Sequence, residues 1–411
     1  MSLYSSLYWQ VLLKRVKIRL YLDVNAQEKR YVATVVLSGY YGYDNAGDEA
    51  LLKAMITALR RLRPNLKIIV LSGQPAVTRR DHGVEAVHRY NPLAVLKVLL
   101  EADLVISGGG SLLQDVTGPM TIPYYLLVVY LAHLLGRKVM FYAQGIGPVN
   151  GQLGQNLIRH VANHVDLITL RDKASAQRLR EMGVHKPPIH VTVDPVFALV
   201  ELDKQEPQGL NNCCPKHHDN LIGQNKENAT STLEAVFCLR RWDGMGIEKA
   251  SFELAQHLLK QGWTITFLPM HAGEDVELGQ EMERKLNHPR AKALSRDLHF
   301  EQAMTIIGRS SLLVGVRLHA LIFATLRGVP VIGISYDPKV TEFLEDSGRP
   351  AFGATAPLTG LDLIEETNRI LKEYEKETHH FRTWAQKMKS KAEQTATLAI
   401  SLMEKKKTKN K

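Results

Sequence analysis

An arginine and a histidine stand together where an apolar strand gives way to a helix. The strand expected at residues 311–314 leads into Arg317 and His319. A lone histidine in apolar surroundings is more often structural than catalytic. An arginine two residues away, at a helix start that itself attracts anions, favours an anion-binding site. Because histidine titrates near neutral pH, His319 is the candidate general acid and base of such a site.

Two further cations follow other expected strands. Arg171 comes directly after residues 167–170, and Lys339 lies just beyond residues 331–335. Ligands of open parallel sheets bind beyond the carboxyl ends of the strands. We therefore predict that Arg171, Arg317 and Lys339 face one cleft, where they suit a phosphate or a carboxylate. Further candidates at strand ends are residues 240–242 (Arg-Arg-Trp) and 269–271 (Pro-Met-His).

A glycine-rich loop at residues 38–49 follows the first expected strand. Its spacing, Gly-x₂-Gly-x₄-Gly, matches neither the dinucleotide fingerprint nor the Walker phosphate loop. Glycine lets backbone N–H groups approach an anion, and the following helix start adds positive potential. The alternative is a tight turn capped by Asp48. The candidates for substrate binding in this loop are Gly39, Gly42, Asn45, Gly47 and Asp48.

Two more glycine clusters follow the strands expected at residues 104–107 and 138–142. Three successive glycines are costly in chain entropy, so they indicate close approach of a ligand or of another backbone segment. Three glycine-rich strand ends in one sheet favour a binding site over three unrelated turns. The glycines of the two clusters are Gly108, Gly109, Gly110, Gly145 and Gly147.

Short apolar runs rich in β-branched residues alternate with helical patterns along most of the chain. This alternation predicts parallel sheets covered by helices on both faces. A polar stretch at residues 203–231 divides the alternation into two series. The fold class is therefore α/β, with two doubly wound, Rossmann-like domains facing a cleft. The remaining expected strands lie at residues 32–37, 67–71 and 189–193, then at 233–239 and 264–268.

The same reading divides the chain into six segments. In order, they are a basic amphipathic extension (1–33), an N-terminal α/β domain (34–200), a flexible insertion (201–231), a C-terminal α/β domain (232–345), C-terminal helices (346–402) and a basic disordered tail (403–411). The insertion holds Cys213, Cys214, His217 and His218. Adjacent cysteines and adjacent histidines match no standard zinc spacing, so no metal site is predicted.

The formal net charge of this 411-residue chain is +10, a first hint of nucleic-acid binding. Residues 1–30 and residues 403–411 each carry a net +4, which leaves +2 for the rest of the chain. Because the body is almost neutral, we expect no nucleic-acid partner. The basic ends favour peripheral contact with an anionic membrane instead.

Three cysteines cannot form a disulfide scaffold, which favours a reducing compartment. The most apolar run, residues 122–135, is shorter than the roughly 20 residues of a membrane span, and it predicts a buried core helix. No signal peptide is evident. We therefore expect a cytoplasmic protein, with the inner face of the membrane as the surface that its basic ends contact.

The chain resembles the bacterial polysaccharide pyruvyl transferases of the cell-surface-anchoring type. The resemblance implies a two-domain fold like that of GT-B glycosyltransferases. It also implies transfer of a pyruvyl group from phosphoenolpyruvate to a sugar as a cyclic ketal, with no cofactor. The implied acceptor is an N-acetylmannosamine residue of a lipid-linked cell-wall polymer precursor, and the product serves surface-layer protein anchoring. The matching segments are residues 38–52, 107–115, 142–149, 169–175, 194–197, 268–271 and 315–339.

In this family the upstream arginine and the Arg-Leu-His segment bind the donor and carry the chemistry. The resemblance therefore assigns phosphoenolpyruvate to Arg171, Arg317, Leu318 and Lys339, and acid–base catalysis to His319. The glycine loops, with Asn45 and Asp48, are assigned to the acceptor side. Two alternatives stay open, a GT-B glycosyltransferase that uses a nucleotide sugar and a non-catalytic binder of acidic polymers. The sequence leaves the acceptor sugar and the oligomeric state open.

Overall fold

The computed structural model describes residues 32–115, 118, 120–204, 233–242, 246–271, 273–295, 298–354 and 356–404. Nearly all of the expected extension and insertion and most of the expected basic tail lie outside these residues. Within the described residues no helix is both long enough and apolar enough to cross a membrane.

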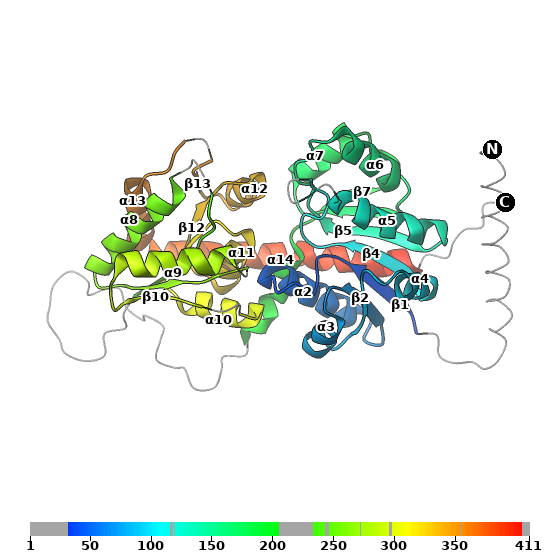
Figure 1. Ribbon diagram of the computed structural model, residues 1–411, viewed down its shortest axis with the longest axis horizontal. Coiled ribbons are helices and arrows are strands. Elements are labelled where there is room, and N and C mark those ends of the chain that lie inside the picture. Colours follow the sequence, from blue (N-terminus) through cyan, green and yellow to red (C-terminus); the bar gives the residue numbers. More distant parts are fainter. Residues whose placement is uncertain are drawn as a thin grey trace.

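The first of two units is a parallel sheet of order β3-β2-β1-β4-β5-β6-β7 (Figure 1). Its strands are β1 (Thr34–Ser38), β2 (Lys67–Ser72), β3 (Glu85–His88), β4 (Leu104–Gly108), β5 (Lys138–Gln144), β6 (Leu167–Leu170) and β7 (Ile189–Val191). Its helices are α2 (Ala46–Leu62), α3 (Pro75–His82), α4 (Pro92–Glu101), α5 (Thr121–Leu134), α6 (Gln152–Ala162) and α7 (Lys173–Glu181). Central strands β1 and β4 are buried along their whole length, because helices cover both faces of the sheet.

The alternation of side chains along β1 separates the two faces. Val35 and Leu37 share a core with α2, whereas Val36 belongs to the core of α4 and α5. The strand order reverses between β1 and β4, so a crevice opens there at the carboxyl edge of the sheet. The glycine-rich loop that links β1 to α2 lies at this crevice.

The second unit repeats the architecture with a sheet of order β10-β9-β8-β11-β12-β13. Its strands are β8 (Glu234–Cys238), β9 (Thr264–Phe267), β10 (Ala291–Ala293), β11 (Leu312–Gly315), β12 (Val331–Ile334) and β13 (Ala351–Phe352). Its helices are α8 (Ile247–Lys260), α9 (Glu274–Leu286), α10 (Phe300–Arg309), α11 (Leu318–Arg327), α12 (Pro338–Asp346) and α13 (Gly360–Lys372). All strand pairs in both sheets are parallel, which confirms the predicted class of two Rossmann-like α/β units.

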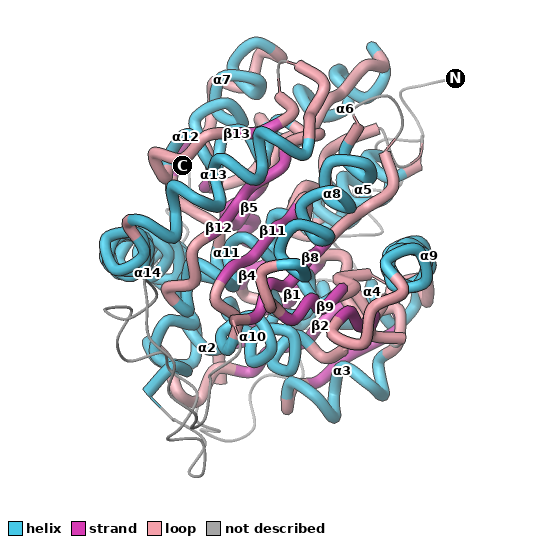
Figure 2. The backbone as a smooth tube through the Cα atoms, turned by 90° about the vertical axis from the view of Figure 1, so that its left-hand side faces the viewer, coloured by secondary structure: helices cyan, strands magenta, loops and turns pink. Residues whose placement is uncertain are grey.

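Helix α14 (Tyr374–Glu404) joins the two units. It runs along the long axis of the molecule, lengthwise in Figure 1 and end-on in Figure 2. The Trp384 ring meets Phe343 of α12 and Phe197 of the 3₁₀ helix η1 (Pro195–Lys204), with centroids 5.2 and 5.5 Å apart. Arg61 of α2 pairs with Glu393 at 2.6 Å. The C-terminal helix thus packs against the first unit as well as the second.

The sequence patterns missed β3, β10 and β13, and the helices α3 and α12. The three strands are two to four residues long and lie at sheet edges, where little apolar sequence is needed. The apolar run at residues 122–135 does form helix α5. It is only partly a core helix, because Leu127 and Leu134 are 55% and 52% exposed.

Candidate active site

A cavity of about 920 Å³ lies between the two units, at the carboxyl ends of their strands. It is lined from both sheets, as expected where two crevices of this kind face each other. The structure brings together there twelve of the residues that the sequence analysis singled out: Asn45, Gly47, Asp48, Gly110, Arg171, Arg240, Met270, His271, Arg317, Leu318, His319 and Lys339.

His319 lies in the first turn of α11 and reaches across to the first unit. A Cβ atom built on Gly47 would overlap the imidazole ring, so the ring rests directly on the backbone at the start of α2. On its other side, His319 Nε2 is 3.6 Å from Oδ2 of the buried Asp194. Burial alone would raise the pKa of Asp194, but His319 and Arg171 together hold it below the ordinary value. The carboxylate therefore stays ionised and orients the histidine.

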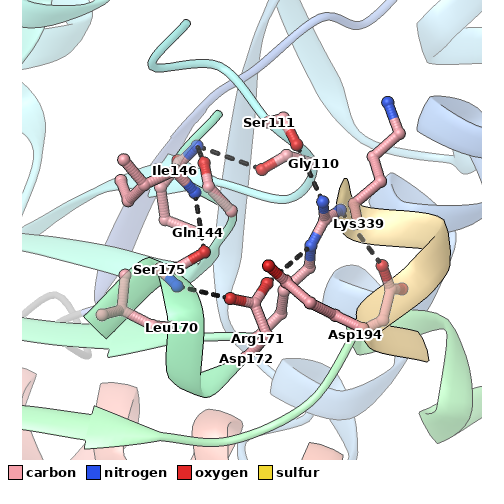
Figure 3. Close-up of polar contacts among 12 residues, drawn as sticks. Gly110, Ser111, Gln144, Ile146, Leu170, Arg171, Asp172, Ser175, Asp194 and Lys339 are labelled. Carbon is pink, nitrogen blue, oxygen red and sulfur yellow. Dashed lines mark hydrogen bonds and ion pairs between the residues drawn. The ribbon is translucent and has the colours of Figure 1, made fainter. Parts of the chain in front are cut away.

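Arg171 is nearly buried at the end of β6 (Figure 3). Its Nη2 donates to Ser111 Oγ at 2.8 Å, and its Nε donates to Asp172 Oδ2 at 3.4 Å. Its Nη1 lies 3.9 Å from Asp194 Oδ2. A Cβ atom on Gly145 would stand 2.8 Å from the guanidinium carbon, so the glycine makes room for this side chain. Arg171 and His319 thus share Asp194 as a common anchor.

Arg317 and Lys339 are also held by carboxylates. Arg317 is the N-cap residue of α11, and its guanidinium makes a bidentate contact with the buried Asp275, with Nε donating to Oδ2 at 3.1 Å. Asp275 also accepts the backbone N–H of Met270 at 3.3 Å. Lys339 Nζ lies 2.9 Å from Asp337 Oδ2 at the start of α12. These pairings fix the direction in which each cation faces the cavity.

The glycine-rich loop ends in a helix start that faces the cavity. Asn45, not Asp48, caps α2, since its Oδ1 accepts the N–H groups of Gly47 and Asp48 at 3.0 and 3.2 Å. The capping role considered for Asp48 is therefore wrong. Burial raises the pKa of Asp48 to about 7, and the opposing effects of His319 and Lys339 do not cancel it. Asp48, in the first turn of α2, thus changes its protonation state near neutral pH.

The neighbouring Glu49 has a structural task. Its Oε1 accepts the N–H of Gly42 at 2.8 Å, and its Oε2 lies 2.7 Å from Nε2 of His82. Gly42 has a φ of +77°, a backbone conformation that favours glycine. The carboxylate of Glu49 therefore stabilises the conformation of the glycine-rich loop, whereas Asp48 lines the cavity.

Six of the candidate glycines do not line the cavity, namely Gly39, Gly42, Gly108, Gly109, Gly145 and Gly147. Close packing explains why glycine stands at several of them. A Cβ atom on Gly39 would meet the Tyr41 ring, and one on Gly147 would stand 2.6 Å from Cβ of Gln114. These glycines shape the loops around the cavity rather than its wall.

Several lining or anchoring residues were missed by the sequence analysis. Asp194 begins the family-matching segment at residues 194–197 but was assigned no role, and Asp275 lies outside the matching segments. Only the fold places these two carboxylates beside His319 and Arg317. Arg89 follows β3, so recognition of that short strand would have put Arg89 at a strand end. The sequence analysis assigned no role to the tyrosines that line the cavity, although Tyr40 lies in the glycine-rich loop and Tyr336 follows the strand expected at residues 331–335. These tyrosines are Tyr40, Tyr90, Tyr124, Tyr125 and Tyr336.

Two Rossmann-like units that face a shared cavity define a GT-B-like fold. Solved structures support this fold. A UDP complex of MnaA from S. aureus is 13% identical, with a TM-score of 0.58 over 85% of this chain and 91% of that chain. Anabaena Alr3699/HepE in complex with UDP-glucose is 14% identical, with a TM-score of 0.58 over 90% and 99%. At these identities the likeness shows the fold alone.

The sequence comparisons define the family. The model of the polysaccharide pyruvyl transferase family matches residues 45–338, and the chain belongs to this family. It is therefore a transferase of polysaccharide biosynthesis. The amylovoran biosynthesis protein AmsJ of Erwinia amylovora is similar, with 21% identity over 398 residues, 83% of this chain and 92% of AmsJ. The predicted membership of the polysaccharide pyruvyl transferase family is confirmed.

Proposed function

We propose that this protein transfers the pyruvyl group of phosphoenolpyruvate to two hydroxyl groups of a sugar, forming a cyclic ketal. The observation that carries the proposal is the position of His319. Its ring lies between the Gly47 backbone and Asp194, in a cavity that also presents Arg171, Arg317 and Lys339. A proton-transfer group surrounded by three oriented cations suits a small dianionic donor.

The three cations match the charges of phosphoenolpyruvate. Its phosphate and carboxylate would accept hydrogen bonds from the N–H groups of Arg171 and Arg317. Lys339 would add a positive charge beside them. Leu318 stands between Arg317 and His319 and also lines the cavity. Its apolar side chain would lie against the methylene carbon of the enol, next to the histidine that protonates it. Arg171 and Arg317 are fixed by their carboxylate partners, so little ordering is required when the donor binds.

The proposed reaction balances in atoms and protons. Protonated His319 gives a proton to the methylene carbon, which becomes a methyl group, and cationic character develops at the neighbouring carbon. One sugar hydroxyl adds to that carbon, inorganic phosphate leaves, and a second hydroxyl adds in its place. Two hydroxyl protons are released, of which one restores the proton that His319 gave to the methyl group. The other leaves through a second base or with the phosphate.

Asp48 is the proposed second base. It lies in the first turn of α2 and lines the same cavity as His319. Its raised pKa, about 7, matches a group that takes a proton from a hydroxyl near neutral pH. Asp48 and His319 approach the cavity from different units, so the acceptor would enter between them.

We further propose a lipid-linked acceptor, an N-acetylmannosamine residue of a cell-wall polymer precursor, met at the inner face of the membrane for surface-layer anchoring. Exposed apolar side chains on and beside α4 and α5, Leu93, Met120 and Leu127, support a surface that contacts lipid. Met120 also lines the cavity. Loss of liposome binding by a variant with these three side chains replaced by serine supports this part, and unchanged binding contradicts it.

A direct assay tests the reaction. The protein is incubated with phosphoenolpyruvate and a lipid-linked disaccharide analogue that ends in N-acetylmannosamine. Phosphate release with a mass gain of one pyruvyl unit on the analogue supports the proposal. No phosphate release contradicts the proposal, and sugar transfer from a UDP-sugar instead would indicate a nucleotide-sugar glycosyltransferase. His319→Ala is expected to abolish turnover while phosphoenolpyruvate still binds, and near-normal turnover would remove His319 from the mechanism.

A further inference from the structure

Arg89 is a buried cation in the wall of the cavity. It is only 5% exposed, yet it lines the cavity in the first unit. Its Nη1 donates to the carbonyl oxygen of Gly39 at 3.0 Å, and its side chain also hydrogen-bonds Tyr124 and Tyr125. Its Nε has no hydrogen-bond partner among the described residues. Among the residues that the structure describes, no carboxylate forms an ion pair with Arg89. A buried charge without a counter-charge is costly in free energy, and a bound anion beside Arg89 would offset that cost.

Tyrosine rings surround the guanidinium. Its carbon lies 4.3 Å from the ring centroid of Tyr124, 5.1 Å from Tyr125 and 5.4 Å from Tyr90. Such cation–π contacts stabilise the side chain but leave its charge in place. We call Arg89, Tyr40, Tyr90, Tyr124 and Tyr125, all of which line the cavity, the Arg89 subsite.

The other arginines of the cavity differ from Arg89. Arg171 and Arg317 lie against Asp194 and Asp275, and both adjoin His319 in the chain or in space. Arg240 also has an Nε without a hydrogen-bond partner among the described residues, but it is only half-buried, donates to the Tyr336 hydroxyl at 3.4 Å, and is influenced by the carboxylates of Glu274 and Asp275. Arg89 is therefore the described cavity arginine whose charge is least compensated.

Asp48 connects the subsite to the proposed chemistry. Burial raises the pKa of Tyr125, Arg89 lowers it and Asp48 raises it again, so both charges act on this one ring. The pKa of Tyr40 responds to the same two groups in the same directions. Tyr40 and Tyr125 are thus within electrostatic reach both of Arg89 and of the base proposed to take a hydroxyl proton from the acceptor.

We propose that the Arg89 subsite binds the acceptor, as a sugar that carries an oxyanion, with the anion on Arg89 and the sugar ring against the tyrosines. The assignment to the acceptor rests on the proposed function. Flat aromatic faces suit the apolar side of a sugar ring, and the guanidinium fork suits a phosphate or a carboxylate. Both sources of the oxyanion share this chemistry, and the experiment separates them.

Calorimetric titration of the full-length protein tests the subsite without turnover. The probes are N-acetylmannosamine 1-phosphate, methyl glucuronide, the neutral methyl glycoside of N-acetylmannosamine, and phosphoenolpyruvate. We expect Arg89→Gln to weaken binding of one charged sugar by about tenfold or more, because a charge-assisted bidentate contact is lost. Loss for the 1-phosphate identifies a phosphate, and loss for the glucuronide identifies a carboxylate. Affinities for phosphoenolpyruvate and for the neutral glycoside should stay unchanged.

Arg137→Gln is the matched control. Arg137 also donates through Nη1 to a backbone carbonyl, that of Ala102 at 3.1 Å, and also has an unpartnered Nε, but it does not line the cavity. Its variant should bind every probe normally. If Arg89→Gln does not fold, Tyr90→Ala replaces it, since Tyr90 is largely exposed at the rim and its loss should weaken the same charged sugar.

The possible results divide cleanly. The subsite is overturned if Arg89→Gln, or Tyr90→Ala where that variant replaces it, binds both charged sugars with unchanged affinity. It is also overturned if the wild-type protein binds neither charged sugar. Weakened binding of phosphoenolpyruvate also overturns it, because Arg89 then belongs to the donor site. Failure of pyruvyl transfer in the direct assay, with charged-sugar binding that still depends on Arg89, would refute the proposed reaction and leave the subsite standing.

Discussion

The imidazole of His319 rests on the backbone of Gly47, in the space that a Cβ atom would need. The two residues come from different units, at the start of α11 and at the start of α2. Any side chain at position 47 would displace the ring, so the glycine fixes how closely the two helix starts approach. This contact, together with the 3.6 Å separation of His319 and Asp194, sets the position of the proposed acid–base group.

Gly47→Ala tests that contact. Alanine is a better helix residue than glycine by about 1 kcal/mol, so helix propensity does not disfavour the variant. We expect the added methyl group to shift the imidazole and to lower kcat by about tenfold or more, since misplacement of a catalytic group is costly. Pyruvyl-transfer kinetics measure kcat, and thermal unfolding checks that the variant is folded. Unaltered kcat in a folded Gly47→Ala protein would show that the ring position is unimportant.

Asp194→Asn tests the anchor that His319 and Arg171 share. Asparagine keeps the size of the side chain but removes the charge that orients the histidine. General acid–base catalysis contributes about 10²–10⁴-fold, and we expect kcat to fall by at least the lower end of that range. Asp172→Asn is the control, because Asp172 contacts Arg171 but caps α7, a role that asparagine also fills. It should raise KM for phosphoenolpyruvate and leave kcat nearly unchanged.

Asp48→Asn should change stability and activity in opposite directions at high pH. The folded-state pKa of Asp48, about 7, lies above its ordinary value of 3.8. Between these values the folded protein holds a proton that the unfolded chain releases, so this group lowers stability as pH rises from about 4 through 7. The variant should therefore melt at a higher temperature than the wild type at pH 8 and at the same temperature near pH 3.

The same variant should lose turnover at pH 8, where the wild-type carboxylate would act as the base. Wild-type kcat should fall as pH drops below about 7. Asp44→Asn is the control, since Asp44 is exposed on the same loop. Thermal melts and kcat at pH 3, 6 and 8 are the measurements. A stability difference that does not depend on pH would contradict the raised pKa.

Glu49→Gln should affect stability more than chemistry. The substitution weakens the contacts of Glu49 with Gly42 and His82, at 2.8 and 2.7 Å. Hydrogen bonds to charged groups contribute about 1.5–3 kcal/mol each, so we expect a loss of about 1–3 kcal/mol in the free energy of unfolding. Denaturant titration measures that loss. The affinity for phosphoenolpyruvate should be normal, and a large drop in that affinity would place Glu49 in the donor site instead.

Local sequence determined the two α/β units and most of the proposed donor site. Apolar strands and helical periodicity are short-range signals, and the cations Arg171, Arg317 and Lys339 follow strands that such signals identify. The rule that parallel strands present their carboxyl ends at one edge then places these side chains together. For the same reason the short edge strand β3 was missed, and Arg89 with it.

Only the tertiary structure decided which charges are paired. The carboxylates of Asp194 and Asp275 meet His319 and Arg317 across long stretches of chain, through contacts that no spacing rule encodes. Even residues that are neighbours in the sequence have different roles, since Asp48 lines the cavity whereas Glu49 stabilises the glycine-rich loop. A residue's type and local pattern are properties of the sequence, but its burial and its charged neighbours arise when distant segments pack. That packing surrounds the Arg89 guanidinium with tyrosine rings and places the Gly47 backbone against the His319 ring.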